Sequence, residues 1–137
     1  MGREYDPRDE KQLPIVTRWL DLTAWLLETT ARMPRQWRHS LVHRLDEEAL
    51  QVLLLLTEAA YRRTKLDVLR ETNLKLTRLR MLLEVAHRVA ALSPGAHERA
   101  VLAADEVGRM LGGWMKDVAA REGPKPDGRP PGRQRLP

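Results

Sequence analysis

Four histidines and the carboxylates are the only strong metal-ligand candidates in this chain of 137 residues, because it contains no cysteine. His39 and His43 lie four residues apart, a spacing at which two imidazoles on one helix face can hold a metal ion. No glutamate stands between them at the metalloprotease position, and the pattern supplies no third donor. We therefore expect solvated or phosphate-facing histidines and no metal site.

Other catalytic patterns are equally incomplete. Glu84 and His87 form an E-x-x-H unit, which di-iron helical bundles use twice together with two further glutamates. The unit occurs once here, one position off the apolar stripe, so we expect both side chains at the edge of a bundle. The acids at 46–48 indicate a solvated turn. Ser40 and Ser93 stand in no nucleophile elbow, and no glycine-rich phosphate loop follows a strand. The sequence predicts neither an enzyme nor a cofactor.

Basic charge is the stronger signal. Lysine and arginine total 24 against 19 acidic residues, for a net charge of +5, and arginine far outnumbers lysine. A GC-rich or thermophilic genome would produce the same bias without any function, whereas selection for forked, bidentate phosphate contacts is the functional explanation. The excess favours an acidic partner, of which nucleic acid is the commonest.

The basic residues gather in two stretches. Residues 32–44 hold four arginines and two histidines around Trp37 with no acid, and residues 62–80 hold seven basic residues against two acidic ones. An ordinary solvated surface would also fit, but the clustering favours phosphate or partner binding. The predicted contact residues are Arg35, Arg38, Arg62, Arg63, Lys75, Arg78 and Arg80.

The elements that must position these residues are helices. Apolar residues recur at steps of three and four between the prolines, which predicts helices over 13–31 and 35–65, a third ending at Leu92, and a fourth that Ser93 caps. Near 64–67 there is no glycine or proline, so a sharp turn and one long helix both remain open. With no strand pattern, the sequence predicts an all-α, up-down-up-down four-helix bundle over residues 13–121. Antiparallel helices would place the basic residues of the first connection and those of the second connection at opposite ends of this bundle.

Two predicted helices carry more apolar surface than one bundle needs. The stretch "LQVLLLLTEAA" is apolar almost all the way round, and the third helix has a second apolar face at Leu82, Val85, Val89 and Leu92. A second apolar face needs a second partner, and self-association is the economical answer. A homo-oligomer is therefore predicted.

Three glycines interrupt the fourth predicted helix, where each weakens helix formation by about 0.5–1 kcal/mol relative to alanine. Gly108 and Gly112 lie four residues apart on one face, which would let a neighbouring helix approach closely while Trp114 and Leu111 supply bulk. The alternative is that Gly112 and Gly113 only loosen the last turns of a surface helix. Core spacing that continues through Trp114 favours close packing.

Both ends differ from the bundle. Residues 1–12 and 122–137 are rich in charge, and the second of these stretches also in glycine and proline, with little to bury, so both are expected to be flexible. There is no apolar run of membrane-spanning length, and Arg3, Glu4 and Asp6 stand where a signal sequence would be apolar. We expect a cytoplasmic protein with no membrane partner.

Two blocks of sequence carry a family resemblance. "LRMLLEVAHRVAALS" followed by "EVGRMLGGWMK", together with "MPRQWRHSLVHRL", resembles the bacterial four-helix-bundle family that includes the intervening-sequence proteins of 23S ribosomal RNA genes and the accessory variability determinant (Avd) of diversity-generating retroelements. The likeness covers roughly residues 13–118. It implies a four-helix protomer, a ring-shaped homopentamer and no catalysis.

For the retroelement branch the resemblance further implies binding to the element's reverse transcriptase and to its template RNA, with DNA or an RNA/DNA hybrid as other nucleic-acid forms, in support of mutagenic copying into a variable gene. The ribosomal branch would instead be a structural or RNA-binding module. The heavily basic surface favours the retroelement branch. An interaction protein with no nucleic-acid role is the remaining alternative.

Overall fold

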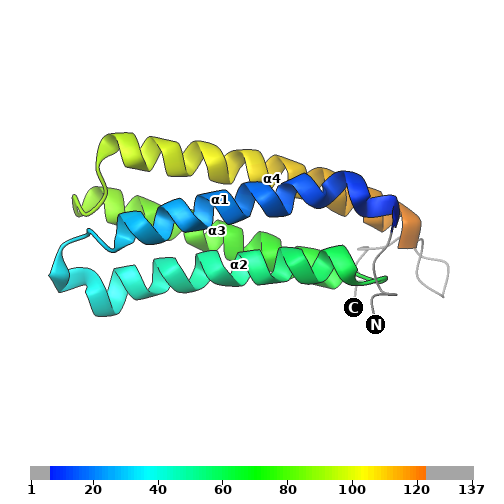
Figure 1. Cartoon of the computed structure of the whole chain (residues 1–137), viewed down its shortest axis with the longest axis horizontal. Helices are drawn as coiled ribbons and strands as arrows, with labels where there is room; N and C mark the ends of the chain where they lie inside the picture. The colour runs from blue at the N-terminus through cyan, green and yellow to red at the C-terminus, as the bar shows by residue number, and fades with distance from the viewer. Residues whose placement is uncertain (1–6, 123–137) are drawn as a thin grey trace, which may run out of the picture.

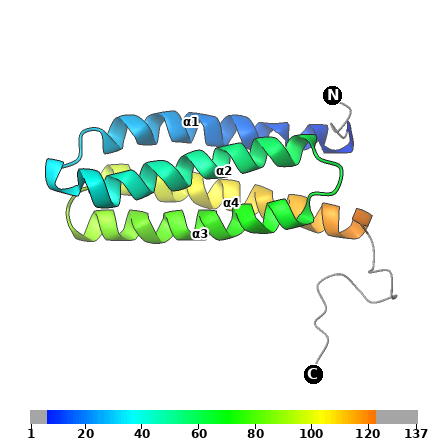
Figure 2. The same cartoon turned by 90° about the horizontal axis from the view of Figure 1, so that it is seen from below.

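Four long helices form the part of the chain that the computed structural model describes, residues 7–122, and no strand occurs within it. Each helix contacts its neighbour in sequence, and the first also contacts the last, which closes an up-down bundle (Figures 1 and 2). This confirms the predicted all-α four-helix fold. The helices are α1 (Leu13–Thr30), α2 (His43–Tyr61), α3 (Leu66–Arg88) and α4 (Pro94–Glu122).

The second predicted helix begins later than its apolar pattern suggested. Two short helices precede α2, the 3-10 helix η2 (Arg35–Trp37) and the π-helix η3 (Arg38–Val42). The break at Met33 and Pro34 was predicted, because proline has no N–H for a helical hydrogen bond and disfavours a helical residue before it. The spacing of apolar residues predicted one continuous α-helix here, because it does not distinguish an α-helix from a short 3-10 helix or π-helix at its start.

The connection between α2 and α3 is a sharp turn, so the alternative of one long helix is wrong. Arg62 has an extended backbone with ψ of 150° after α2, and α3 begins four residues later at Leu66. No glycine or proline is needed, because the backbone N–H of Lys65 donates to Oε2 of Glu122 at 2.9 Å. The turn is thus stabilised by a contact with the end of α4, and not by a glycine or proline within the turn itself.

The third helix ends at Arg88, before the predicted Leu92. Ala90 adopts a left-handed backbone with φ of 61°, and the N–H groups of Ala91 and Leu92 both donate to the carbonyl of Ala86, at 2.8 and 3.1 Å. A left-handed alanine costs about 1–2 kcal/mol. Burying Leu92, which is 2% exposed, offsets this with about 1.5–3 kcal/mol. The predicted cap of α4 is confirmed, since Ser93 Oγ accepts from the Ala96 N–H at 3.2 Å.

The core follows the predicted apolar stripes of α3 and α4. Every stripe residue within these helices is buried, and Trp19 and Trp114 are among the largest fully buried side chains. Ala90, the last residue of the stripe predicted for the third helix, is exposed, because α3 has already ended at Arg88. Trp19 also joins two helices, because its Nε1–H donates to the carbonyl of Ala49 at 2.9 Å. The stripe residues are Leu69, Thr72, Leu76, Leu79, Leu83 and Ala86 on α3, and Ala100, Ala104, Val107, Leu111, Trp114 and Val118 on α4.

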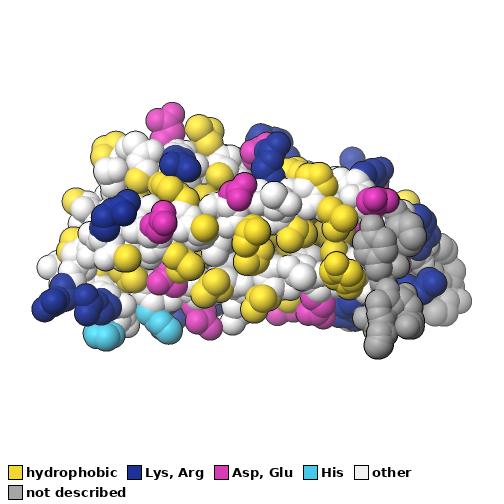
Figure 3. Space-filling model, viewed as in Figure 1, with side chains coloured by type: hydrophobic (Ala, Val, Ile, Leu, Met, Phe, Trp, Pro, Cys, Tyr) yellow, Lys and Arg dark blue, Asp and Glu magenta, His cyan; other side chains and the backbone are white. Residues whose placement is uncertain are grey.

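Much apolar surface is left outside the core, as predicted for α2 and α3. Leu54 and Met81 are 66% and 59% exposed, and Figure 3 shows hydrophobic side chains spread over α1 and α2 among charged ones. Leu92 does not belong to this surface, since the early end of α3 turns it into the core. The large exposed apolar residues are Leu20, Leu50, Leu54, Tyr61, Leu74, Met81, Val85, Val89 and Leu102.

The ordered part starts before the predicted boundary at residue 13. Residues 7–12 form a 3-10 helix, η1 (Pro7–Gln12), with Asp9 only 3% exposed, and Glu122 belongs to α4. Both were assigned to flexible ends because they lie outside any apolar repeat. Residues 1–6 and the predicted tail from 123 to 137 lie outside the described residues. In the part described, no helix is both long and apolar enough to cross a membrane.

Candidate nucleic-acid interface

The first predicted basic zone is an exposed segment at one end of the bundle, and its own residues, 32–44, include no acid. Arg35 and Arg38 are both exposed on the short helices between α1 and α2, and neither forms an ion pair within residues 7–122. His39 and His43 are exposed beside them, and basic and histidine side chains lie together where α2 begins (Figure 3). Trp37 is half-buried and packs against the core, so it anchors this basic segment to the bundle.

The second zone lies at the opposite end, as the antiparallel order of the helices predicted (Figure 1). Arg62 is half-exposed and pairs with Glu58 one turn back on α2, at 3.1 Å. Arg63, by contrast, is exposed and has no partner within the described residues. The two adjacent arginines therefore differ, and Arg63 is the one available to a ligand.

The third predicted group, Lys75, Arg78 and Arg80, does not form one patch. Arg78 reaches from α3 to α2, where Nη2 lies 2.7 Å from Oε2 of Glu48. Arg80 points the other way, toward α4. Residues two apart on a helix project about 200° from each other, so the sequence cluster divides between two faces.

Arg80 ties α3 to α4. Its Nε lies 3.2 Å from Oδ1 of Asp105 and its Nη2 donates to the carbonyl of Ala104 at 3.1 Å. A side chain held by two contacts and about one-third exposed has little left for a ligand. Arg80 therefore takes part in helix packing, and its contact with a ligand stays a prediction.

Lys75 and Arg78 border a hollow of about 270 Å³ between α2 and α3, together with His43, Arg44, Glu47, Glu48 and Gln51. Glu48 was expected in a solvated turn, but it is buried, and its Oε1 has no hydrogen-bond partner in the described residues. The turn was inferred from three consecutive acids, whereas α2 has already begun there and turns Glu48 toward α3. Two carboxylates in the lining make this hollow less suited to phosphate than the ends of the bundle.

Gly108 and Gly112, the predicted packing pair, have different surroundings. A Cβ at Gly108 would clash with Nη2 of Arg80, so this glycine makes room for the guanidinium. Gly112 and Gly113 are exposed, and a Cβ added at either would meet only its own helix within 4 Å. The close approach is thus real at Gly108 but involves a side chain, and no helix of the same protomer approaches Gly112. Trp114, the third predicted packing residue, is fully buried.

The E-x-x-H residues lie at the bundle edge, as expected, and both contact the same histidine on α4. Oε2 of Glu84 lies 2.8 Å from Nε2 of His97, whose ring stacks on that of His87 with centroids 4.2 Å apart. No group of three metal-ligating side chains with suitable geometry occurs within residues 7–122. These residues connect α3 and α4.

A known protein family matches most of this chain. The family is described as bAvd-like, the bacterial Avd proteins, and the match covers residues 13–118. The chain belongs to the bAvd-like family. No curated protein matches it significantly. The match spans α1, α2 and α3 and most of α4, and it suggests an accessory variability determinant of a diversity-generating retroelement, from a family of non-catalytic accessory proteins.

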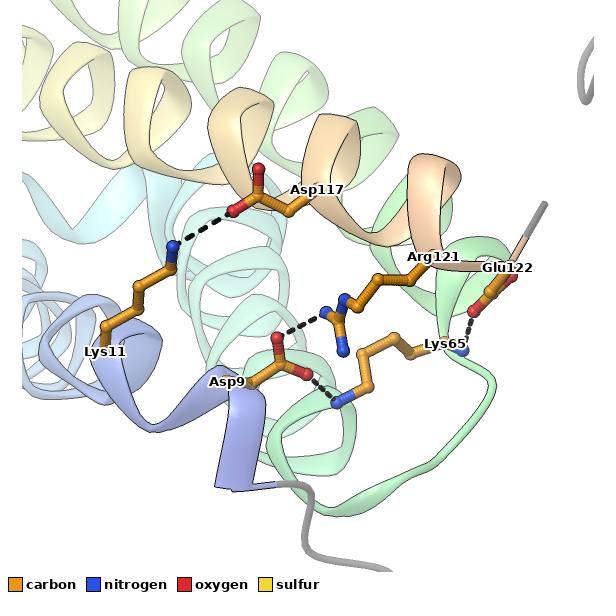
Figure 4. A network of polar contacts seen from close by, with 6 residues as sticks. All are labelled: Asp9, Lys11, Lys65, Asp117, Arg121 and Glu122. Atoms are coloured by element: carbon orange, nitrogen blue, oxygen red, sulfur yellow. Dashed lines mark hydrogen bonds and ion pairs between the residues drawn. The ribbon is translucent and has the colours of Figure 1, made fainter.

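One part of this bAvd-like protein was missed by sequence reasoning. Asp9 on η1 pairs with Nζ of Lys65 and, at 2.5 Å, with Nη2 of Arg121 near the end of α4, as Figure 4 shows. Asp9 and Arg121 lie outside the matched range and Lys65 inside it. An aspartate in a charged, aperiodic segment carries no sequence signal of burial, so only the folded chain identifies this network.

Proposed function

We propose that this protein is a non-catalytic, homopentameric accessory protein of a diversity-generating retroelement, which binds the element's reverse transcriptase and template RNA during mutagenic copying. The observation that carries the proposal is the bAvd-like match over residues 13–118. It favours the retroelement branch over the ribosomal intervening-sequence branch.

The charge distribution supports RNA as the ligand. Arg35 and Arg38 at one end of the bundle, and Arg63 at the other, are exposed cations without acidic partners in residues 7–122. Such arginines can form charge-assisted hydrogen bonds with phosphate oxygens without first breaking an internal ion pair. No base-reading motif accompanies them, so binding depends on phosphates and shape more than on sequence.

The apolar surface supports self-association. Leu54 on α2 and Met81 and Val85 on α3 leave roughly half or more of their side-chain surface in water, and burying apolar surface contributes about 25 cal/mol per Å². A ring of copies would repeat every basic zone around its axis. Contacts that are weak singly then combine through multivalency.

A salt series on RNA binding tests the nucleic-acid part of the proposal. Log affinity should fall linearly with log salt, and Arg35→Ala/Arg38→Ala should flatten the slope by about 0.7–0.9 for each phosphate that the variant no longer neutralises. Arg109→Ala is the control, because Arg109 is exposed near the middle of α4, away from both ends of the bundle. Equal slopes for wild type and both variants would contradict an RNA-binding role for this zone.

Co-purification tests the polymerase part. The reverse transcriptase of the proposed retroelement should elute with this protein on size exclusion and should raise its apparent RNA affinity. A polymerase that neither elutes with the protein nor changes RNA binding leaves a structural interaction protein as the better account.

A further inference from the structure

An arginine-lined hollow lies at the end of the bundle where three segments meet. Its volume is about 220 Å³, enough for a phosphate group with part of a sugar. The walls come from η1, from the α2–α3 connection and from the last turns of α4. The lining residues are Arg8, Arg63, Thr64, Val118, Arg121 and Glu122.

The hollow rests on a rigid, buried base. Lys65 is fully buried and pairs with Asp9, which also receives Nη2 of Arg121 at 2.5 Å. Lys65 Nζ further lies 5.6 Å above the ring of Trp114. In Figure 4 the Lys65 and Arg121 side chains converge on Asp9 from different elements. The position of the Arg121 guanidinium is therefore set by the fold before any ligand arrives, which reduces the entropy cost of binding.

The charge of the lining favours an anion. Three arginines and one glutamate line the hollow, and the Glu122 carboxylate already accepts the Lys65 backbone N–H at 2.9 Å. A neighbouring hollow that shares Arg8 and Arg121 is different, because Asp9 and Asp117 line it and Lys11 pairs with Asp117 at 3.5 Å. The hollow lined by Arg63 therefore has more arginines than carboxylates, and it also has the hydroxyl of Thr64.

We propose that the hollow between Arg8, Arg63 and Arg121 is a binding site for a phosphate group of an RNA backbone. This rests on the proposed RNA-binding function and assigns a specific position to it. Guanidinium groups bind phosphate oxygens through paired N–H donors, and the Thr64 hydroxyl can donate a further hydrogen bond. The lining holds no aromatic platform and no amide side chain for a base edge, so the site takes phosphate irrespective of sequence.

The test uses the full-length protein and a fluorescent single-stranded oligouridine in an anisotropy titration at several salt concentrations. Arg63→Ala should lower the affinity about tenfold, as expected for loss of a charged hydrogen bond of about 1.4 kcal/mol, and should flatten the salt slope by about 0.7. Arg63→Lys should recover part of the loss, because it keeps the charge without the fork. Arg109→Ala is the control for removing one exposed arginine.

A second measurement locates the ligand. Inorganic phosphate, added at constant ionic strength, should shift the backbone amide resonances of residues 62–65 and 118–122 in wild type and not in Arg63→Ala. Phosphate-dependent shifts combined with unchanged RNA affinity in Arg63→Ala would identify a site for free phosphate and overturn the proposal.

The outcomes separate this site from the proposed function. If wild type binds RNA with a steep salt dependence and Arg63→Ala behaves like Arg109→Ala, the hollow is not an RNA site while the RNA-binding function stands. If wild type binds no RNA at any salt concentration, both are overturned. Arg63 has no partner within the described residues, so its substitution is expected to leave the melting temperature unchanged, which circular dichroism checks.

Discussion

Lys65 and Asp9 are 56 residues apart in the chain and form an ion pair in which the two side chains are 0% and 4% exposed. The pair connects the first turn of the described chain to the α2–α3 connection, and Arg121 extends it to the end of α4. A buried charge is tolerated only while it is paired, because removing one partner leaves the other desolvated. The ordered bundle therefore depends on Asp9, a residue outside the four predicted helices.

Replacing Asp9 by alanine is expected to lower the free energy of unfolding by about 3–5 kcal/mol, since Lys65 would remain buried without its counter-ion. Urea denaturation followed by circular dichroism measures this, with Glu10→Ala, an exposed neighbour, as the control. Asp9→Leu combined with Lys65→Met should recover most of the stability, because an apolar pair of similar volume needs no desolvation of charge. Similar losses in Asp9→Ala and Glu10→Ala would contradict the importance of the pair.

Gly108 and Gly112 should respond differently to alanine. Gly112→Ala is expected to raise the free energy of unfolding by about 0.5–1 kcal/mol, because space is available and alanine loses less backbone entropy. Gly108→Ala should give no such gain, since the new Cβ displaces Arg80 from Asp105 and Ala104. Thermal unfolding of both variants decides this. A lower oligomer mass in Gly112→Ala would instead indicate that another subunit approaches this glycine.

The exposed apolar residues of α2 and α3 should mediate self-association. Leu54→Glu and Val85→Glu place a charge where the proposed ring would exclude water, and both are expected to lower the molar mass measured by light scattering. Leu102→Glu, at an equally exposed leucine on α4, is the matched control and should leave the mass unchanged. Wild type that scatters as a monomer at micromolar concentration would exclude the ring itself.

The two large buried tryptophans allow a matched comparison. Trp19 donates a hydrogen bond to Ala49, whereas Nε1 of Trp114 is buried with no partner in the described residues. Trp19→Phe should therefore cost about 1 kcal/mol more than Trp114→Phe, beyond the similar loss of volume at each site. Unfolding free energies of the two variants test the difference. A larger loss in Trp114→Phe would mean that its contact with Lys65 outweighs the missing hydrogen bond.

Sequence alone determined the four helices and their order, because apolar residues at steps of three and four give each helix one buried face. The stripe from Ala100 to Val118 is buried as its spacing predicted, and so is the stripe of the third helix from Leu69 as far as Ala86, but not its last residue, Ala90. The turn capped by Ser93 and the placement of two basic zones at opposite ends followed from local signals and antiparallel order. The family resemblance also came from sequence, and the bAvd-like match agrees with it over the same residues.

Tertiary structure decided which polar side chains are available. Four arginines of the second basic stretch contribute equally to the net charge but differ in the folded chain. Three of them form ion pairs: Arg62 with Glu58, Arg78 with Glu48 and Arg80 with Asp105. Arg63 has no such partner in the described residues. The role of Gly108 and the burial of Asp9 and Lys65 likewise depend on side chains from distant helices. The spacing of apolar residues shows which face of a helix is buried. Ion pairs and close approaches depend instead on which side chains of the neighbouring helix pack against that face. The sequence around a residue gives no signal of which distant side chains those are.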